Sequence, residues 1–275
     1  SADTAYFMPF CNHFFLEPEV AVRYTPDRRE FLDFEHYGEY DLFKTESSIE
    51  AGTFIRSLGK ISAGFMNEYF LYDYSSKFPQ DDIGSFVNSF FFHSRMDNIN
   101  SVVLPEHGTF LELMFKYSNE IFGSEDTYMK IKFTFWQYFQ FLRKSSFGFK
   151  VFTGMDFATD LPYYDRSFLS YVNAFPGYSN NEFSSRNIIG GVADYKLNIF
   201  NLNLGGKREK LFLILRGGVA ASYEDFDLFT GGDRDLIYGG GIGLGLNLPH
   251  CPIVLEASMN DNRRIMMHLS AGNKF

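Results

Sequence analysis

The sequence lacks most features that mark soluble enzymes, nucleic-acid binders and helical membrane proteins. Its two cysteines, Cys11 and Cys251, fit no metal or redox spacing. No stretch approaches the roughly 18 consecutive apolar residues of a membrane-spanning helix. Basic residues number 25 against 34 acidic ones, and no Lys- or Arg-rich run occurs. These absences exclude a helical membrane protein and argue against nucleic acid as a partner.

Signatures of catalysis and cofactor binding are missing as well. The chain contains no G-x-S-x-G nucleophile elbow and no H-E-x-x-H pair, and its six histidines are scattered. The glycine-rich run at residues 239–245 does not match the phosphate-binding pattern G-x-G-x-x-G. We therefore expect no catalytic residue, no metal ion and no cofactor in this chain.

Aromatic residues, in contrast, are abundant. The chain has 34 Phe and 17 Tyr, yet its mean hydropathy is only -0.17. Both facts fit a chain in which apolar and polar residues alternate over short segments. That alternation is present at residues 129–141 and 147–157, where apolar side chains at odd positions oppose Lys, Gly, Asp and Thr at even ones. It recurs at residues 111–117, 189–199, 236–248, 253–260 and 264–275.

A period of two over ten or more residues predicts strands whose faces meet different environments. The length favours strands that cross a membrane over those of a large soluble β protein, which average about five or six residues. Short and long connections alternate, with residues 97–107 as the one exception. Outer-membrane barrels have short periplasmic turns and long extracellular loops. We expect the C-terminus in the periplasm and the long loops outside.

The predicted fold is an all-β, antiparallel up-and-down transmembrane β-barrel, with residues 1–275 as a single domain. Counting gives 13 or 14 strands, if a less regular strand within residues 29–40 and a weak one before Cys11 are included. Single-chain bacterial barrels have even strand numbers.

The second half of the chain resembles the barrel of the bacterial surface-antigen superfamily, the BamA/TamA-like proteins. The resemblance is carried by the glycine-rich run 239–246 and by a closing strand with apolar residues at alternate positions. It implies a barrel of sixteen strands in the bacterial outer membrane, of which the first hairpin and any upstream domain would precede Ser1. It also implies a C-terminal assembly signal, formed here by Leu269, Ala271 and Phe275.

Within that superfamily, residues 38–275 look most like the barrels of PlpD-type patatin-like phospholipases. Residues 104–109, 160–165, 175–178 and 187–190 carry this likeness. It implies that the long loop at residues 158–187 folds into the lumen, with the motif Phe175, Pro176, Gly177 and Tyr178 at its tip. Assembly and transport members carry Arg where this chain has Pro176, which argues against that role unless Arg166 or Arg186 replaces the missing cation.

Charged residues of both signs fall on the face predicted to line the lumen. They are Glu112, Lys130, Lys132, Lys150, Asp156, Asp194, Lys196 and Glu256. No ring of a single sign appears, so mutually neutralising charges that pack a largely filled lumen are favoured over a substrate path.

These observations predict a non-enzymatic barrel that is the membrane anchor, or the export channel, of a patatin-like outer-membrane protein. The alternatives are an assembly or translocation factor of the superfamily and a small-solute pore. The expected partners are outer-membrane lipid and lipopolysaccharide, and the barrel assembly machinery during biogenesis. An upstream lipase or periplasmic segment, or a partner chain that completes the barrel, would be a further partner.

Overall fold

The structure is a computed structural model. It describes residues 2–9, 13–32, 35–55, 59–74, 83–101, 103–141, 144–157, 167–169, 175–178, 183–204, 207–223, 235–248 and 251–272. No helical segment in these residues has the length and hydropathy that a membrane crossing requires.

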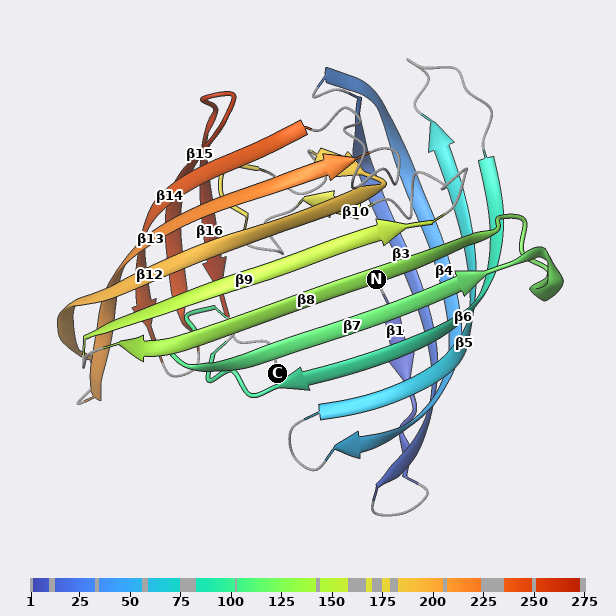
Figure 1. The fold of residues 1–275 in the computed structure, drawn as a ribbon, viewed down its shortest axis with the longest axis horizontal. Coiled ribbons are helices and arrows are strands. Elements are labelled where there is room, and N and C mark those ends of the chain that lie inside the picture. Colours follow the sequence, from blue (N-terminus) through green and yellow to red (C-terminus); the bar gives the residue numbers. More distant parts are fainter. Residues whose placement is uncertain are drawn as a thin grey trace.

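One antiparallel sheet of fourteen strands makes up almost all of the described chain (Figure 1). From β3 to β16, each strand of this sheet pairs with the strand of the sheet that comes next in sequence, which is an up-and-down topology. The strands are β1 (Ala2–Ala5), β2 (Met8–Pro9), β3 (Phe14–Leu32), β4 (Glu35–Ile55), β5 (Gly59–Tyr74), β6 (Ile83–Asp97), β7 (Gly108–Ser118), β8 (Tyr128–Phe141), β9 (Ser145–Asp156), β12 (Asn187–Leu204), β13 (Lys207–Tyr223), β14 (Asp235–Asn247), β15 (Ile253–Asn260) and β16 (Ile265–Ala271). A separate hairpin joins β10 (Ser167–Leu169) to β11 (Phe183–Ser185), and a short 3-10 helix, η1 (Glu120–Phe122), lies between β7 and β8.

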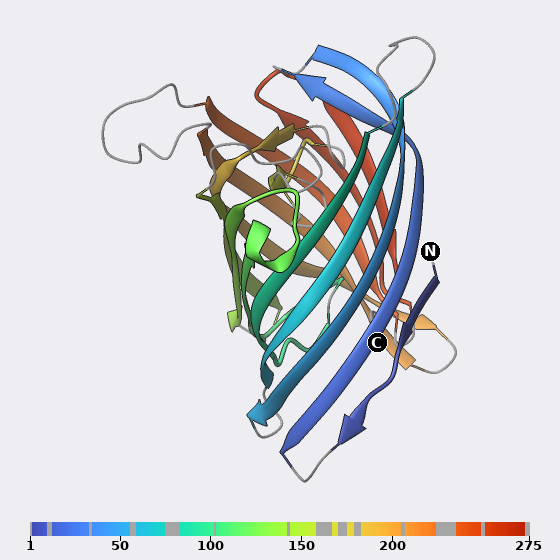
Figure 2. The ribbon, with the colours of Figure 1, turned by 90° about the vertical axis from the view of Figure 1, so that its right-hand side faces the viewer.

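The sheet curls around a lumen (Figures 1 and 2). Strands β3 to β6 form one side, β7 to β9 cross the front in Figure 1, and β12 to β16 form the opposite side. Strands β1 and β2 both pair with β3, so they occupy the same edge of the sheet. Within the described residues, β16 does not pair with this edge, and the sheet is open there.

The two faces of the strands differ as the sequence predicts. In β9 the inward residues Lys150, Phe152 and Asp156 are buried, whereas the outward Phe147 and Val151 are exposed. The last strand follows the same rule: the outward residues Ile265, Met267 and Leu269 are 71 to 72% exposed. An outer face this apolar suits hydrocarbon rather than water.

Phenylalanine is not confined to the outer face. Phe15, Phe91, Phe152 and Phe212 are buried on the inner face. They lie among the charged residues and fill part of the lumen. The high Phe content therefore serves both faces of the sheet.

One strand prediction is wrong. Residues 29–40 do not form a strand of their own, because β3 continues to Leu32 and β4 begins at Glu35. The alternation is less regular there because the pairing of β3 with β4 shifts register twice, between Thr25 and Arg28 and between Glu30 and Phe31. The weak strand before Cys11 does occur, as β1 and β2.

The connections fall into two groups at opposite ends of the sheet. At the short-turn end, β4 meets β5, β8 meets β9, β12 meets β13 and β14 meets β15 after two to five intervening residues. The β6–β7 connection is also at this end but is longer, and its described residues turn into the lumen. The opposite end holds the long connections after β5, β7, β9 and β13. It also holds two short ones, of two residues between β3 and β4 and of four between β15 and β16, so the predicted alternation of short and long connections is not strict.

Candidate functional site

The tip of the connection between β9 and β12 is packed inside the lumen. Phe175 and Tyr178 have no exposed surface, and Pro176 and Gly177 are also buried. The Phe175 ring meets the Phe152 ring edge to face, with 6.3 Å between the centroids. The apolar cluster around the tip consists of Phe152, Phe175, Tyr178, Ile188, Val192, Ala220 and Ile237. Residues 175–178, the loop tip, are therefore held by β9 and β12 to β14.

Glycines on the barrel wall give the loop tip its place. A Cβ atom at Gly239 of β14 would lie 2.2 Å from the Pro176 carbonyl oxygen. One at Gly218 of β13 would lie 2.9 Å from the Phe175 ring. Side chains at these two positions would occupy the space that the loop tip fills. The inward glycines of β13 and β14 thus form a slot for it.

Gly177 itself makes the closest approach to the wall. Its φ of 87° is in the left-handed region, which favours glycine. A Cβ there would lie 2.5 Å from the backbone nitrogen of Asn260 and 2.6 Å from the carbonyl carbon of Met259. Beside it, the Tyr178 hydroxyl donates a 2.5 Å hydrogen bond to the Asp261 carboxylate. The tip is thus also fixed against the end of β15 and the residue that follows it.

A buried ion-pair cluster lies next to the loop tip, two residues along β13. The Arg216 guanidinium donates from Nε to Asp194 of β12 at 2.6 Å and from Nη1 to Glu256 of β15 at 2.8 Å. The Arg216 side chain is 8% exposed and each carboxylate side chain 1%. One cation therefore joins three strands.

Glycine again allows the contact across an intervening strand. Arg216 reaches Glu256 over β14, where a Cβ at Gly241 would lie 2.8 Å from the Glu256 carboxylate. On the other side, the Tyr138 hydroxyl of β8 donates a 2.8 Å hydrogen bond to Asp194 of β12. Its ring passes over β9 at Gly148, where a Cβ would lie 2.1 Å from the ring.

Two buried lysines surround this cluster. The Lys196 ammonium lies 4.3 Å from the centroid of the Tyr138 ring and donates a 2.9 Å hydrogen bond to the Pro105 carbonyl oxygen. The Lys150 ammonium lies 4.5 Å from the centroid of the Trp136 ring. Aromatic faces stabilise these cations where water is excluded. Arg216, Asp194, Glu256, Tyr138, Lys196 and Lys150 are called the charged cluster below.

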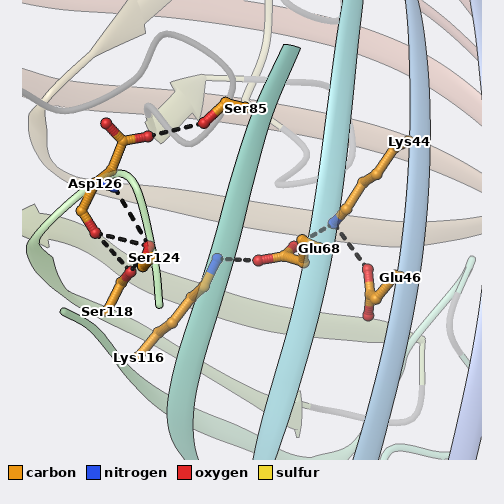
Figure 3. Close-up of polar contacts among 8 residues, drawn as sticks. All are labelled: Lys44, Glu46, Glu68, Ser85, Lys116, Ser118, Ser124 and Asp126. Carbon is orange, nitrogen blue, oxygen red and sulfur yellow. Dashed lines mark hydrogen bonds and ion pairs between the residues drawn. The ribbon is translucent and has the colours of Figure 1, made fainter. Parts of the chain in front are cut away.

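A second set of charges crosses the opposite wall of the lumen (Figure 3). Glu46 of β4, Lys44 of β4, Glu68 of β5 and Lys116 of β7 alternate in sign, with ion pairs of 2.8, 2.6 and 2.5 Å. Beside them, the Ser118 and Ser124 hydroxyls donate to the Asp126 carbonyl oxygen and join the two ends of the β7–β8 loop. The four-residue ladder is neutral, so it stiffens the wall without creating a field of one sign.

The whole sequence matches one protein family. Residues 3–275 match the Omp85 superfamily domain. The chain belongs to the Omp85 superfamily. The β-barrels of this superfamily lie in the outer membrane. No curated protein matches the sequence.

Solved Omp85-like structures share the fold at low sequence identity. The crystal structure of BamA from Haemophilus ducreyi lacking POTRA domains 1–3 has a TM-score of 0.75 and 12% identity, and the match covers 98% of this chain and 61% of that one. CdiB from Acinetobacter baumannii has a TM-score of 0.57 and 12% identity, and the match covers 99% of this chain and 50% of that one. The chain thus spans about half to three fifths of the length of these structures. At this identity they show the fold alone.

The structure places most of the predicted lumenal charges in contact with other side chains. Asp194, Lys196, Glu256 and Lys150 come together in the charged cluster. Glu112 lies 3.1 Å from His93, and the backbone N–H of Asp156 donates to Asn187 at 2.8 Å. Lys130 is buried, whereas Lys132 is exposed to the lumen. Lys132 also borders a cavity of about 530 Å³ that extends along β3 to β9 and β12.

The C-terminal signal residues lie partly within the described chain. Leu269 and Ala271 are exposed on the outer face of β16. Phe275 lies outside the described residues, as does Arg166. Arg186 has a buried Nε atom near the start of β12 and is not part of the charged cluster.

The prediction from sequence missed three groups that organise the site. Arg216 is the only cation on the inner face of the second half of β13. The alternation of apolar and polar residues at 207–223 would have identified it as a lumenal residue. Tyr138 is at an inner-face position of the alternation at residues 129–141, but its contact with Asp194 could not be predicted, because it depends on Gly148 of another strand. Leu104, described below, lies in the one connection whose length broke the pattern. Within the described residues, no cluster of three or more His, Cys, Asp or Glu side chains could hold a metal ion.

Proposed function

We propose that this chain is the membrane barrel of a two-part outer-membrane protein and anchors a segment attached to it. The resemblance of residues 38–275 to PlpD-type barrels makes a patatin-like lipase domain the expected attachment. In this arrangement the short-turn end and the C-terminus face the periplasm and the long loops face outward. The chain itself performs no catalysis and serves as a membrane anchor.

The observation that carries this proposal is the apolar hold on the loop tip. Pro176 occupies the position where assembly and transport members of the family carry Arg. The cation that faces Asp194 and Glu256 comes instead from the wall, as Arg216. The described loop tip, residues 175–178, therefore brings no charge to the charged cluster. It is held by apolar contacts, close backbone packing and the hydrogen bond from Tyr178 to Asp261, which suits a static anchor.

The match of residues 3–275 to the Omp85 superfamily favours a second candidate. In that case the barrel would act on other polypeptides as an assembly or translocation factor. The same fold is seen in BamA and CdiB. The two candidates differ in which polypeptides need the barrel. An anchor is needed by the segment attached to it, whereas an assembly or translocation factor is needed by other proteins.

Deleting the gene in the source bacterium separates the candidates. For an anchor, we expect other outer-membrane barrels to stay within about twofold of their normal folded amounts, measured by heat-modifiable gel migration. The intact mass of the mature protein should exceed that of these 275 residues, and the additional segment should lose its membrane association when the barrel is removed. A severalfold fall in other folded barrels would instead support the assembly factor, and a mature protein without an additional segment would overturn the anchor.

A further inference from the structure

The β6–β7 connection turns into the lumen and reaches the far wall. Its described residues, 98–101 and 103–107, are called the inward turn. Leu104 has no exposed surface and packs with Phe212, Ile214 and Val254 of β13 and β15. Strands β8, β9 and β12 separate β7 from β13 in the sheet. The inward turn therefore crosses the lumen, rather than lying beside the strands it connects.

The turn is built to hold its shape. The Asn100 side-chain oxygen accepts hydrogen bonds from the backbone N–H groups of Glu106 at 2.9 Å and His107 at 3.0 Å. The Asn98 side chain accepts one from Thr109, and Gly108 has a φ of 116°. A Cβ at Gly108 would lie 2.4 Å from the Asn98 carbonyl oxygen. A turn whose amides are satisfied internally can move as one piece without exposing unpaired backbone groups.

Three different contacts hold the turn on the far wall. The Leu104 side chain lies over Gly245 of β14, where a Cβ would be 2.7 Å from it. The Lys196 ammonium donates to the Pro105 carbonyl oxygen at 2.9 Å, and Lys210 pairs with Glu106 at 2.7 Å. All three contacts involve residues 104–106, so displacement of these residues from the wall breaks all three together.

We propose that the inward turn is a stopper that closes the short-turn end of the lumen. Phe212, Gly245 and Val254 lie near the short-turn ends of their strands, so the seat is at that end. The described cavity of about 530 Å³ lies along β3 to β9 and β12 and has no residue of the turn in its lining. Departure of the turn from its seat opens a path from the short-turn end to this cavity. This inference does not depend on what is attached to the barrel.

Electrical conductance of the purified full-length protein in a planar lipid bilayer tests the stopper. Glu106→Lys and Lys210→Glu each replace the ion pair by two like charges, and we expect each to raise the mean conductance about threefold or more. The double variant Glu106→Lys with Lys210→Glu restores an ion pair of opposite polarity and should return to within twofold of the wild type. Leu104→Asp places a carboxylate in an apolar seat and should give the largest increase, tenfold or more.

Lys144→Glu is the matched control, because Lys144 is an exposed lysine in the β8–β9 turn at the same end. Its conductance should stay at the wild-type value. If Leu104→Asp does not fold, the charge-exchange series still decides, since Lys210 is 37% exposed and Glu106 has 12% exposure. Wild-type conductance in both single charge variants would overturn the proposal, as would failure of the double variant to restore closure.

Discussion

Replacing Arg216 with methionine should destabilise the barrel by about 3 to 5 kcal/mol, because it leaves Asp194 and Glu256 buried without their shared cation. Methionine fills similar space but cannot donate a hydrogen bond. The free energy of unfolding in urea, followed by heat-modifiable gel migration of the purified protein, measures the loss. The free energy of unfolding of Arg216→Lys should lie between those of Arg216→Met and the wild type, because one ammonium cannot reproduce two hydrogen bonds from a planar guanidinium.

The matched control also removes the two carboxylate charges that Arg216→Met leaves without their cation. Arg216→Met combined with Asp194→Asn and Glu256→Gln should recover part of the stability, since no buried carboxylate is then left without its cation. The recovery is incomplete because the buried Lys150 and Lys196 lose their carboxylate neighbours. If the triple variant is as unstable as Arg216→Met, then packing of the guanidinium, and not its charge, holds the three strands together. If Arg216→Met is as stable as the wild type, the cluster is not a structural centre of the wall.

The faces of the strands could be predicted from the sequence because lipid and lumen impose opposite demands on successive residues. Lys150 and Asp156 oppose Phe149 and Val151 in the sequence, and in the structure the first pair is buried on the inner face. The strand ends were less predictable. The β3–β4 pairing shifts register, so residues 29–40 lose a clean period of two.

The partners of the inner charges could not be predicted, because they are set by which side chain crosses a neighbouring strand. Tyr138 reaches Asp194 only because Gly148 lies between them, and Arg216 reaches Glu256 only because of Gly241. The inward glycines of residues 239–245 make room for three different groups. In the structure only Gly239 of that run has the loop tip as its nearest neighbour. Gly241 faces the Glu256 carboxylate, and Gly245 faces Leu104 of the inward turn.

The same reasoning predicts that Gly239→Ala displaces the loop tip from the wall. Its Cβ would lie 2.2 Å from the Pro176 carbonyl oxygen, so the tip or the strand has to move. Gly177→Ala should act in the same direction, because its Cβ would lie 2.5 Å from the Asn260 nitrogen and the backbone there has a left-handed φ of 87° that alanine disfavours. We expect each variant to lose about 2 to 4 kcal/mol, the upper part of the range for forced overpacking plus backbone strain.

Limited proteolysis in detergent measures the displacement directly, because a tip that leaves its slot exposes the backbone at 175–178 to protease. Gly217→Ala and Gly240→Ala are matched controls: a Cβ at Gly217 meets nothing within 4 Å, and one at Gly240 lies 3.7 Å from the nearest atom. These two neighbours of the slot glycines face outward, so each control makes the same Gly→Ala change within a strand without contacting the tip. Cleavage at 175–178 in the inner variants but not in the outer ones would place the effect in the slot. Equal protection of all four would show that the tip does not depend on the glycines, and the static hold on which the anchor proposal rests would then be lost.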